Sequence, residues 1–426
     1  MRFRRATAAA LAVVALAASA CGTSTQSPTT SGSQPSPTLP IPLYSPGPSV
    51  PPEPVDIVYA RIERQVQDLR MLQATRAIDP KVLDTDALGK QLRERFDRET
   101  PADVLTANER VYKLLGLLPK DSSLKDLELR LLTSQVAGFY DPDEKSLFVV
   151  SRSGGLGPSE QVTFAHEFTH ALQDQHFGLK KLGTDDTDHS DRALARLCVA
   201  EGDATLLMTD WAQANLSPVQ LLQMAAEASN PEQTAILNAM PGSLRDQLLF
   251  PYTTGLAFVE GAYNSGGWQA VDALYAKPPN STEQLLHPDK YQSNEQPVDV
   301  SVPADLATRL GAGWHVDLED TLGEFAIRDW LGIAGNLANS QSDAAAAGWG
   351  GDRIALVSSG SAHGLVIQTT WDTPADAAEF ATAATVALGG VNGETSLSGP
   401  SGSSSVRVLI ASERSALDRL KTALGG

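Results

Sequence analysis

FAHEFTHALQDQHF, residues 164–177, places His166, Glu167, His170 and His176 within about three helical turns. The chain has only 7 histidines in 426 residues, so the order H-E-x-x-H would arise by chance about 0.007 times per chain. Residues i and i+4 share a helix face, so His166 and His170 can both direct a ring nitrogen at one point about 2 Å away. The stretch therefore predicts a metal site on a helix, in preference to a solvated helix with two surface histidines.

The residues before the motif predict how its helix begins. Pro158 follows a glycine and suits the first turn, and Glu160 favours a helix N-terminus. Upstream, residues 141–144 form a turn signal and Leu147–Val150 has the composition of a short strand. Such a strand could pair with an extended peptide, or it could be an ordinary strand of the core.

A catalytic zinc site needs three protein ligands, and His176 is the first candidate for the third. The spacing His166, His170, His176 fits H-E-x-x-H-x-x-G-x-x-H, but Gln173 occupies the glycine position. A left-handed turn at that position costs a residue with a side chain about 1–2 kcal/mol. The three-histidine arrangement is therefore the weaker alternative.

Glu201 is the third ligand that we predict. It lies in LCVAEGDATLL, central in a helix of apolar and small residues, and a buried carboxylate there requires a partner such as a zinc ion. Gly202 would let this helix approach the motif helix closely. Asp203 points to roughly the opposite face and could orient other groups. Asp174 is a remote alternative ligand, and a solvent-facing role for Glu201 is the alternative without metal.

Two neutral imidazoles suit Zn²⁺, and a carboxylate beside a zinc-bound water can take its proton as general base. These residue types therefore predict Glu167 as a catalytic base.

HEFTHALQDQHF followed by AEGDA resembles the gluzincin class of zinc metallopeptidases. Together with PYTTGLAFVEGAYNSGGWQAV, PPNSTEQLLHPDKY and GWGGDR, it resembles a group of predicted bacterial exported metallopeptidases over roughly residues 135–355. The resemblance implies a zincin-like catalytic domain with a short strand or hairpin before the motif helix. It also implies His166, His170 and Glu201 as zinc ligands and Glu167 as the base.

Peptide hydrolysis also needs a donor for the developing oxyanion, and in gluzincins a later Tyr or His often supplies it. We predict His287, at the end of a short helix, in this catalytic role, with a helix-capping structural role as the alternative. Tyr252 and Tyr263 are further candidates, and Tyr140 is a lesser one.

The chain begins MRFRRATAAALAVVALAASAC, a short basic segment and an apolar run before Cys21. We interpret residues 1–20 as an export signal and Cys21 as the lipidated first residue of a membrane-tethered lipoprotein; the alternative is a secreted protein cleaved after Ala20. Residues 22–54 hold 10 of the 26 prolines and no charge before Glu53, which predicts a semi-extended tether. Cys198 is the remaining cysteine, so we expect it to be a small buried residue rather than half of an intrachain disulfide.

The charge excludes nucleic acid as a partner. Residues 1–20 carry three arginines and no acid, so the net charge of −18 becomes −21 without them. We expect a peptide or protein substrate.

The remaining chain predicts an α+β protein that is predominantly helical. Apolar spacing of three and four predicts an all-helical layer over 55–137 and further helices up to about residue 276. Beyond residue 300 we predict a helical connector at 317–340 and a small α+β domain. Its strand-like segments are DRIALVSS, HGLVIQTTW and VRVLIAS. We expect a metallopeptidase domain over 55–300 and the connector with the α+β domain over 301–426.

The sequence therefore predicts an exported zinc metallopeptidase, and an endopeptidase in particular. The alternative from another class is a non-catalytic envelope lipoprotein that uses a zincin-like fold to bind peptide or protein.

Overall fold

The computed structural model describes residues 53–425 apart from 136, 151–155, 230 and 400–401. The predicted signal, Cys21 and nearly all of the predicted tether lie outside these residues. Among the helices that are described, none combines the length and apolar character needed to cross a membrane.

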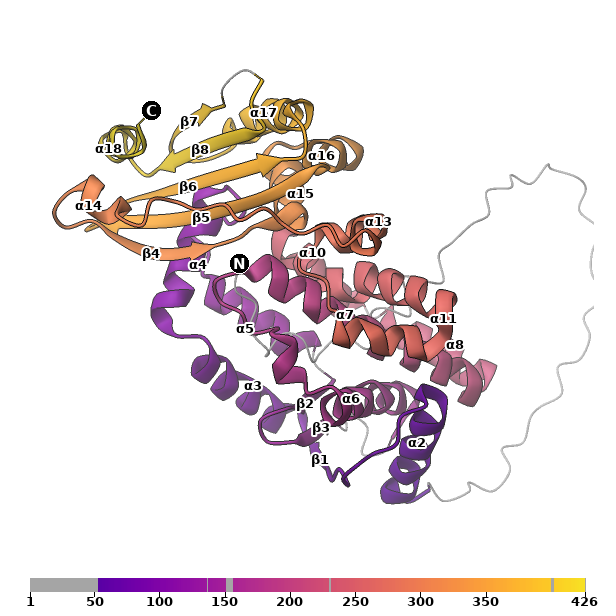
Figure 1. Ribbon diagram of the computed structural model, residues 1–426. Coiled ribbons are helices and arrows are strands. Elements are labelled where there is room, and N and C mark those ends of the chain that lie inside the picture. Colours follow the sequence, from indigo (N-terminus) through magenta and orange to yellow (C-terminus); the bar gives the residue numbers. More distant parts are fainter. Residues whose placement is uncertain (1–52, 136, 151–155, 230, 400–401, 426) are drawn as a thin grey trace, which may run out of the picture.

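The chain up to residue 292 is mostly helical (Figure 1). Its helices are α2 (Val55–Arg70), α3 (Thr85–Glu99), α4 (Ala102–Leu114), α5 (Leu124–Gln135), α6 (Pro158–His176), α7 (Ser190–Asn215), α8 (Pro218–Ala228), α9 (Pro231–Asn238), α10 (Gly242–Phe250), α11 (Leu256–Ala276), α12 (Glu283–Leu286) and α13 (Pro288–Gln292). A 3₁₀ turn η2 (Leu179–Leu182) follows α6, and a π-helical turn η3 (Pro251–Gly255) joins α10 to α11.

The remainder is a sheet with helices on both faces (Figure 1). Its elements are α14 (Leu306–Leu310), β4 (His315–Asp320), α15 (Gly323–Ala334), α16 (Asn339–Ala346), β5 (Trp349–Ser359), β6 (Ala362–Trp371), α17 (Pro374–Leu388), β7 (Glu394–Ser398), β8 (Ser405–Ala411) and α18 (Arg414–Leu424). The prediction of a predominantly helical α+β protein is confirmed. The three strands expected from the C-terminal pattern are present as β5, β6 and β8.

Three strands were missed by the sequence pattern. β1 (Pro80–Leu83) interrupts the layer that we predicted to be all helical, and β4 occupies the beginning of the predicted helical connector. β7 was not expected in the C-terminal part. All three are short, and their side chains are mostly exposed or half-buried, so none has the apolar alternation that marks a strand.

The strand before the motif helix lies in the middle of a three-stranded sheet. β3 (Ser146–Val150) pairs in parallel with β1 and antiparallel with β2 (Gly138–Asp141). The interpretation of Leu147–Val150 as an edge for an extended peptide is therefore wrong, because both edges of β3 are already paired. Its alternative, a strand of the core, is confirmed, since all four residues are buried.

The five-stranded sheet has the order β4-β5-β6-β8-β7, and every neighbouring pair is antiparallel. Side chains alternate between the two faces of the sheet along β5. Ile354 and Leu356 lie on the face covered by α4, α15 and α17. Ala355 and Val357 lie on the face covered by α14 and α18. Helix α4 precedes residue 300, so one core crosses the predicted domain boundary. That boundary stays a prediction.

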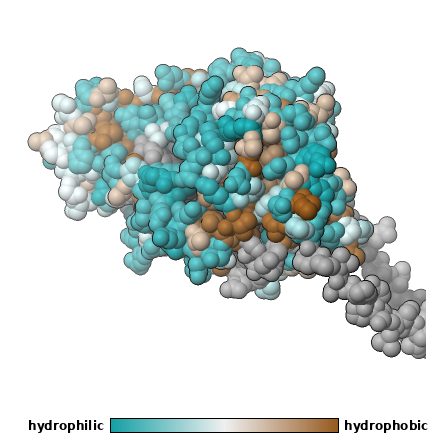
Figure 2. Space-filling view, turned by 90° about the horizontal axis from the view of Figure 1, so that it is seen from below, coloured by the Kyte–Doolittle hydropathy of each residue, from teal (hydrophilic) through white to brown (hydrophobic). Residues whose placement is uncertain are grey.

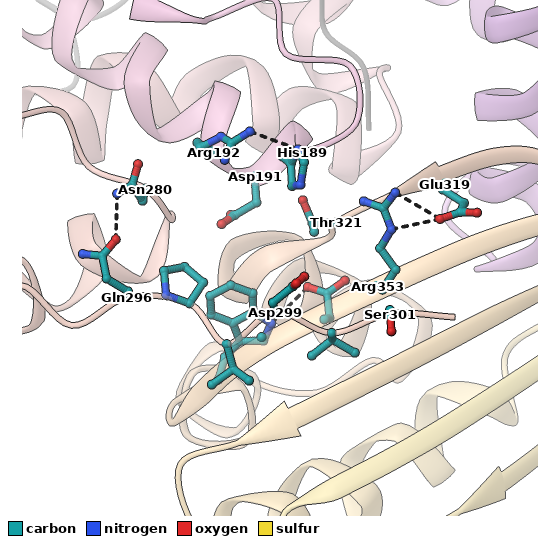
Figure 3. Close-up of a pocket in the computed structure, with 16 residues that line it drawn as sticks. His189, Asp191, Arg192, Asn280, Gln296, Asp299, Ser301, Glu319, Thr321 and Arg353 are labelled. Atoms are coloured by element: carbon teal, nitrogen blue, oxygen red, sulfur yellow. Dashed lines mark hydrogen bonds and ion pairs between the residues drawn. The ribbon is translucent and has the colours of Figure 1, made fainter. Parts of the chain in front are cut away.

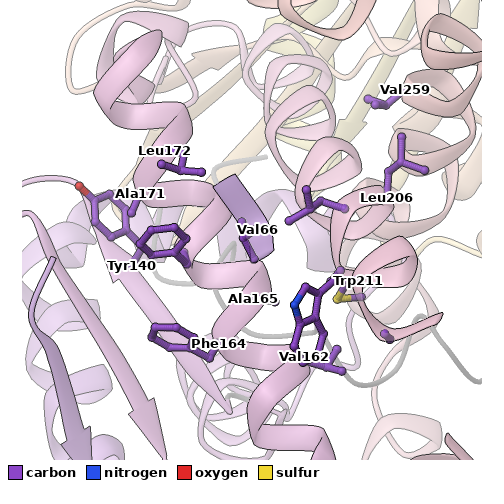
Figure 4. Packing of buried hydrophobic residues seen from close by; sticks show 14 of the residues in the cluster. Val66, Tyr140, Val162, Phe164, Ala165, Ala171, Leu172, Leu206, Trp211 and Val259 are labelled. Atoms are coloured by element: carbon purple, nitrogen blue, oxygen red, sulfur yellow. The ribbon is translucent and has the colours of Figure 1, made fainter. Parts of the chain in front are cut away.

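The motif helix α6 is largely enclosed by the rest of the fold. Gly157 precedes it, Pro158 occupies its first turn as predicted, and fourteen of its nineteen residues are buried. Helices α2, α7 and α8 and strands β2 and β3 pack against it. Figure 4 shows Val66, Val162, Leu206 and Trp211 in this core. Because most of its faces are covered, the polar residues of α6 are fixed among buried neighbours.

Helix α7 is crossed closely by η3. A Cβ on Gly202 would lie 2.3 Å from the carbonyl oxygen of Gly255, and a Cβ on Gly255 would lie 2.7 Å from the carbonyl oxygen of Cys198. We expected Gly202 to allow close approach of the motif helix. The segment that approaches Gly202 closely is instead the π-helical turn η3. The expected burial of Cys198 is confirmed.

The surface is mostly hydrophilic. In Figure 2 teal covers most of the face that is shown, and brown is confined to small patches. Among the described residues, the large apolar side chains that are exposed include Val219 and Leu222 on α8.

We predict that Gly202→Ala lowers the free energy of unfolding by about 1–3 kcal/mol, because the added methyl group overpacks the contact with Gly255. Gly261→Ala is the matched control: it lies in α11, and its Cβ would meet nothing within 4 Å. This control should be neutral or stabilise the protein by up to about 1 kcal/mol. Urea unfolding followed by circular dichroism measures both. Equal stability of the two variants would contradict the close contact.

Candidate metal centre

Helices α6 and α7 bring together the three side chains that we predicted as ligands. His166 and His170 stand one turn apart on α6, and Glu201 faces them from α7. The two Nε2 atoms are 3.1 Å apart, and Glu201 Oε2 lies 3.3 Å from that of His166 and 3.5 Å from that of His170. Their exposed fractions are 0%, 6% and 1%. Three potential ligand atoms therefore face one another inside the protein.

The spacing of these atoms fits a tetrahedral zinc ion. Zinc bonds to imidazole nitrogen and carboxylate oxygen are about 2.0–2.2 Å long, which sets tetrahedral ligand atoms about 3.3–3.6 Å apart. The measured separations span 3.1–3.5 Å. Two nitrogens and one oxygen are also the donor set of a catalytic zinc site. The residues present fit the metal.

The charges of the three groups depend on one another. Burial raises the pKa of Glu201, but the charge of His170 and hydrogen bonds from both histidines outweigh it and bring the pKa to about 2. Burial lowers the pKa of His170, but the charge of Glu201 outweighs it and raises the pKa to about 9. Burial also lowers the pKa of His166. Without metal, the site therefore favours one positive charge beside one carboxylate.

Glu167 is buried next to the trio of His166, His170 and Glu201. Burial raises its pKa to about 8, although the charge of His170 and a backbone hydrogen bond from Tyr140 on β2 lower it. Its Oε2 atom has no hydrogen-bond partner among the described residues. A buried carboxylate oxygen without a partner is costly. A water molecule or a substrate proton would satisfy it.

The alternative ligands are engaged elsewhere. His176 is exposed and its Nε2 lies 2.7 Å from the backbone oxygen of Gln73. Asp174 accepts hydrogen bonds from Tyr140 and Lys145. The structure therefore places both residues outside the trio.

The predicted oxyanion donors lie in different surroundings. His287 Nε2 is 2.8 Å from Glu324 on α15, which matches the structural alternative, and its catalytic role stays a prediction. Tyr263 stacks edge-on against Trp268, and the Tyr140 hydroxyl donates to Asp174. Tyr252, in the π-helical turn, has its ring 6.3 Å from that of His166. Of these four side chains, Tyr252 is the one with a ring contact to the trio.

Two residues near the site were missed by sequence reasoning. Gln173 contacts His170, and Arg70 from α2 binds Asp203 behind it. The expectation that Asp203 orients other groups rather than the ion agrees with these contacts. From the sequence, Gln173 was weighed only for its effect on a left-handed turn. Arg70 ends an amphipathic helix, and nothing in the local sequence indicates that its side chain is buried.

A second cluster of acids has a cation within it. Glu283, Glu295 and Asp372 could together hold a metal ion. Lys290 Nζ lies 2.6 Å, 2.9 Å and 2.6 Å from their respective carboxylate oxygens. The ammonium group already neutralises them, so this cluster is an ion-pair network.

A cavity of about 590 Å³ lies apart from the trio, where the beginning of α7 faces β5 and the segment 296–301 (Figure 3). The metal-ligand candidates do not line it. Its arginines are already paired, Arg192 with Asp186 and Arg353 with Glu319. The candidate metal site and this cavity are therefore separate sites in the protein.

Residues 309–416 match a family described as a domain of unknown function (DUF8575). This stretch contains the five-stranded sheet and none of the trio. Among curated proteins, none matches the chain. A solved structure of a candidate hydrolase with a novel fold from Chloroflexus aurantiacus is similar, with 17% identity over 56% of this chain and 90% of that chain. Its TM-score is 0.36, too low to support an argument about this chain.

We predict that His287→Gln lowers stability at pH 6 but not at pH 9. The hydrogen bond to Glu324 raises the pKa of His287, and the charges of Glu324 and Glu283 act in the same direction, against that of Lys290. The stabilisation is therefore complete below the ordinary histidine pKa of about 6.5 and is lost as the pH rises through the raised value. Glutamine keeps a donor without the charge. We expect a loss of about 0.5–1 kcal/mol, because a third of the His287 side chain is exposed.

Urea unfolding at the two pH values measures this difference. His363→Gln is the control, because the ring of His363 contacts a backbone oxygen rather than a carboxylate. A loss for His287→Gln that is equal at both pH values would contradict the ion pair.

Proposed function

We propose that this chain is a zinc metallopeptidase of the gluzincin class, with a zincin-like catalytic part built on α6 and α7. The observation that carries the proposal is the separation of 3.1–3.5 Å among the ligand atoms of His166, His170 and Glu201. A cation bound between the two histidines of α6 and the glutamate of α7 would offset the burial of the carboxylate. Zinc suits the donor set.

Each side chain of the site has a separate role in the proposed hydrolysis. When bound, zinc polarises a peptide carbonyl and lowers the pKa of water toward neutrality. Glu167 takes the proton of the attacking water at its unpartnered oxygen and later delivers it to the leaving amine. Tyr252 is the hydroxyl that we propose for the developing oxyanion in place of His287, because its ring lies against that of His166.

The surroundings favour a catalytic site over a closed structural one. A structural zinc site is usually closed by four protein ligands. Among the described residues, the cluster contains three potential ligands, and the adjacent acid is Glu167, which has one oxygen unpaired. These features support hydrolysis over the alternative of a peptide-binding lipoprotein that does not react.

The sequence supports an extracytoplasmic location. We propose that the chain is exported, that Cys21 carries a lipid anchor and that the proline-rich segment holds the enzyme away from the membrane. The net charge of −21 without residues 1–20 favours a peptide or protein substrate over nucleic acid.

We predict that Glu167→Gln lowers peptide hydrolysis by at least about 100-fold while bound zinc is unchanged, since the amide cannot accept the proton. Cleavage of an internally quenched peptide library and metal analysis of the same sample measure the two quantities. Glu160→Gln, in the first turn of α6, is the matched control and should keep full activity. Zinc bound without turnover in the wild type would instead favour the non-catalytic alternative.

A further inference from the structure

We propose that Gln173, Asp203 and Arg70 form a positioning relay that fixes the ring of His170 for the metal, so that helix α2 is part of the metal centre. This inference rests on the proposed function, because it assigns a purpose to residues behind a proposed zinc ligand. It adds positioning residues from a helix that the H-E-x-x-H motif does not include.

The first step is the hydrogen bond between His170 and Gln173. His170 Nδ1 lies 2.9 Å from Gln173 Oε1. The amide nitrogen of Gln173 faces two acceptors, Asp203 Oδ2 at 3.0 Å and the carbonyl of Ala200 at 3.0 Å. These acceptors fix the amide orientation, so its oxygen faces the ring. His170 therefore keeps a proton on Nδ1, and in its neutral form it directs the lone pair of Nε2 toward His166 and Glu201.

The second step holds the glutamine in place. Gln173 has no exposed surface, and Asp203 has none either. Asp203 also accepts a hydrogen bond of 2.7 Å from the Tyr275 hydroxyl of α11. A break in α11 at Gly266–Gly267, where both residues depart from helical dihedral angles, sets the direction of the segment that carries Tyr275.

The third step is a buried arginine. Arg70, the last residue of α2, donates from Nε at 2.8 Å and from an Nη at 3.1 Å to the two oxygens of Asp203. It also binds Asp272 at 2.7 Å and lies over the ring of Trp268 at 4.5 Å. The Asp203 carboxylate is thereby neutralised and unable to rotate.

The relay explains why the polar side chains of Gln173, Asp203 and Arg70 are buried here. Arg70 and Asp203 lose their hydration when they are buried, and apolar residues would pack the same space without that cost. Partners behind a metal-bound histidine fix its tautomer and ring orientation, and their loss typically lowers metal affinity 10- to 100-fold. A purely structural ion pair would not need Gln173 between Asp203 and His170.

The test replaces the middle of the relay. Gln173→Leu removes the acceptor of His170 Nδ1 but leaves Asp203 bound to Arg70 and Tyr275, so the chain should fold. We expect zinc affinity, measured on the full chain by competition with a chelator, to fall 10- to 100-fold. In the metal-free chain, the protected Nδ1–H resonance of His170 should disappear from ¹⁵N-histidine spectra; His170→Asn identifies that resonance in the wild type.

Two further variants make the outcome specific. Gln175→Leu is the matched control, because Gln175 stands five residues beyond His170 on α6 and its side chain hydrogen-bonds Thr75 and the backbone of Arg76. It should leave both readouts unchanged. The double variant Gln173→Glu with Asp203→Asn provides an acceptor for His170 Nδ1 at position 173 and an amide donor to that acceptor at position 203. It should return zinc affinity to within about threefold of wild type.

Each result has one interpretation. An unchanged affinity and Nδ1–H resonance in Gln173→Leu would overturn the relay, as would an equal fall in Gln175→Leu or a double variant as weak as Gln173→Leu. A wild type that binds no zinc would overturn the proposed function instead. The resonance of the metal-free chain would still report whether the relay orients His170.

Discussion

The contact between α6 and α7 buries three ionisable groups against one another, and the arrangement around it follows from the cost of that burial. Each ion removed from water costs several kcal/mol unless a partner compensates it. Glu201, with 1% of its surface exposed, has two imidazoles as partners. The pairing is strong enough to bring the pKa of Glu201 down to about 2 despite its burial. A divalent cation at the same point would satisfy all three groups at once.

That constraint explains the composition of the neighbouring helices. Glu201 can face α6 only if the rest of α7 packs tightly, and Gly202 admits the backbone of the π-helical turn at a distance that no side chain would allow. The same turn carries Tyr252 toward His166. π-Helical turns inside helices are found frequently at functional sites. The apolar core, the close backbone contact and the polar trio are thus one connected arrangement.

The sequence predicted the part of the site that depends on local spacing. His166, Glu167 and His170 follow from helix periodicity, and Glu201 follows from the improbability of a carboxylate in an apolar helix without a partner. Arg70 lies 133 residues from its partner Asp203, and no local pattern relates two positions at such a separation. β1 and β4 were missed because tertiary pairing, not alternation of apolar residues, forms them. The position of β3 between two strands was likewise determined by β1, which the helical pattern concealed.

The measurement that tests the account most directly is bound zinc per chain in the purified full chain, for the wild type, Glu201→Ala and His176→Ala, with folding checked by circular dichroism. The account predicts about one zinc in the wild type, retention in His176→Ala and loss in Glu201→Ala. Loss in His176→Ala alone would contradict the assignment of Glu201. The absence of zinc from all three proteins would contradict the metal centre itself.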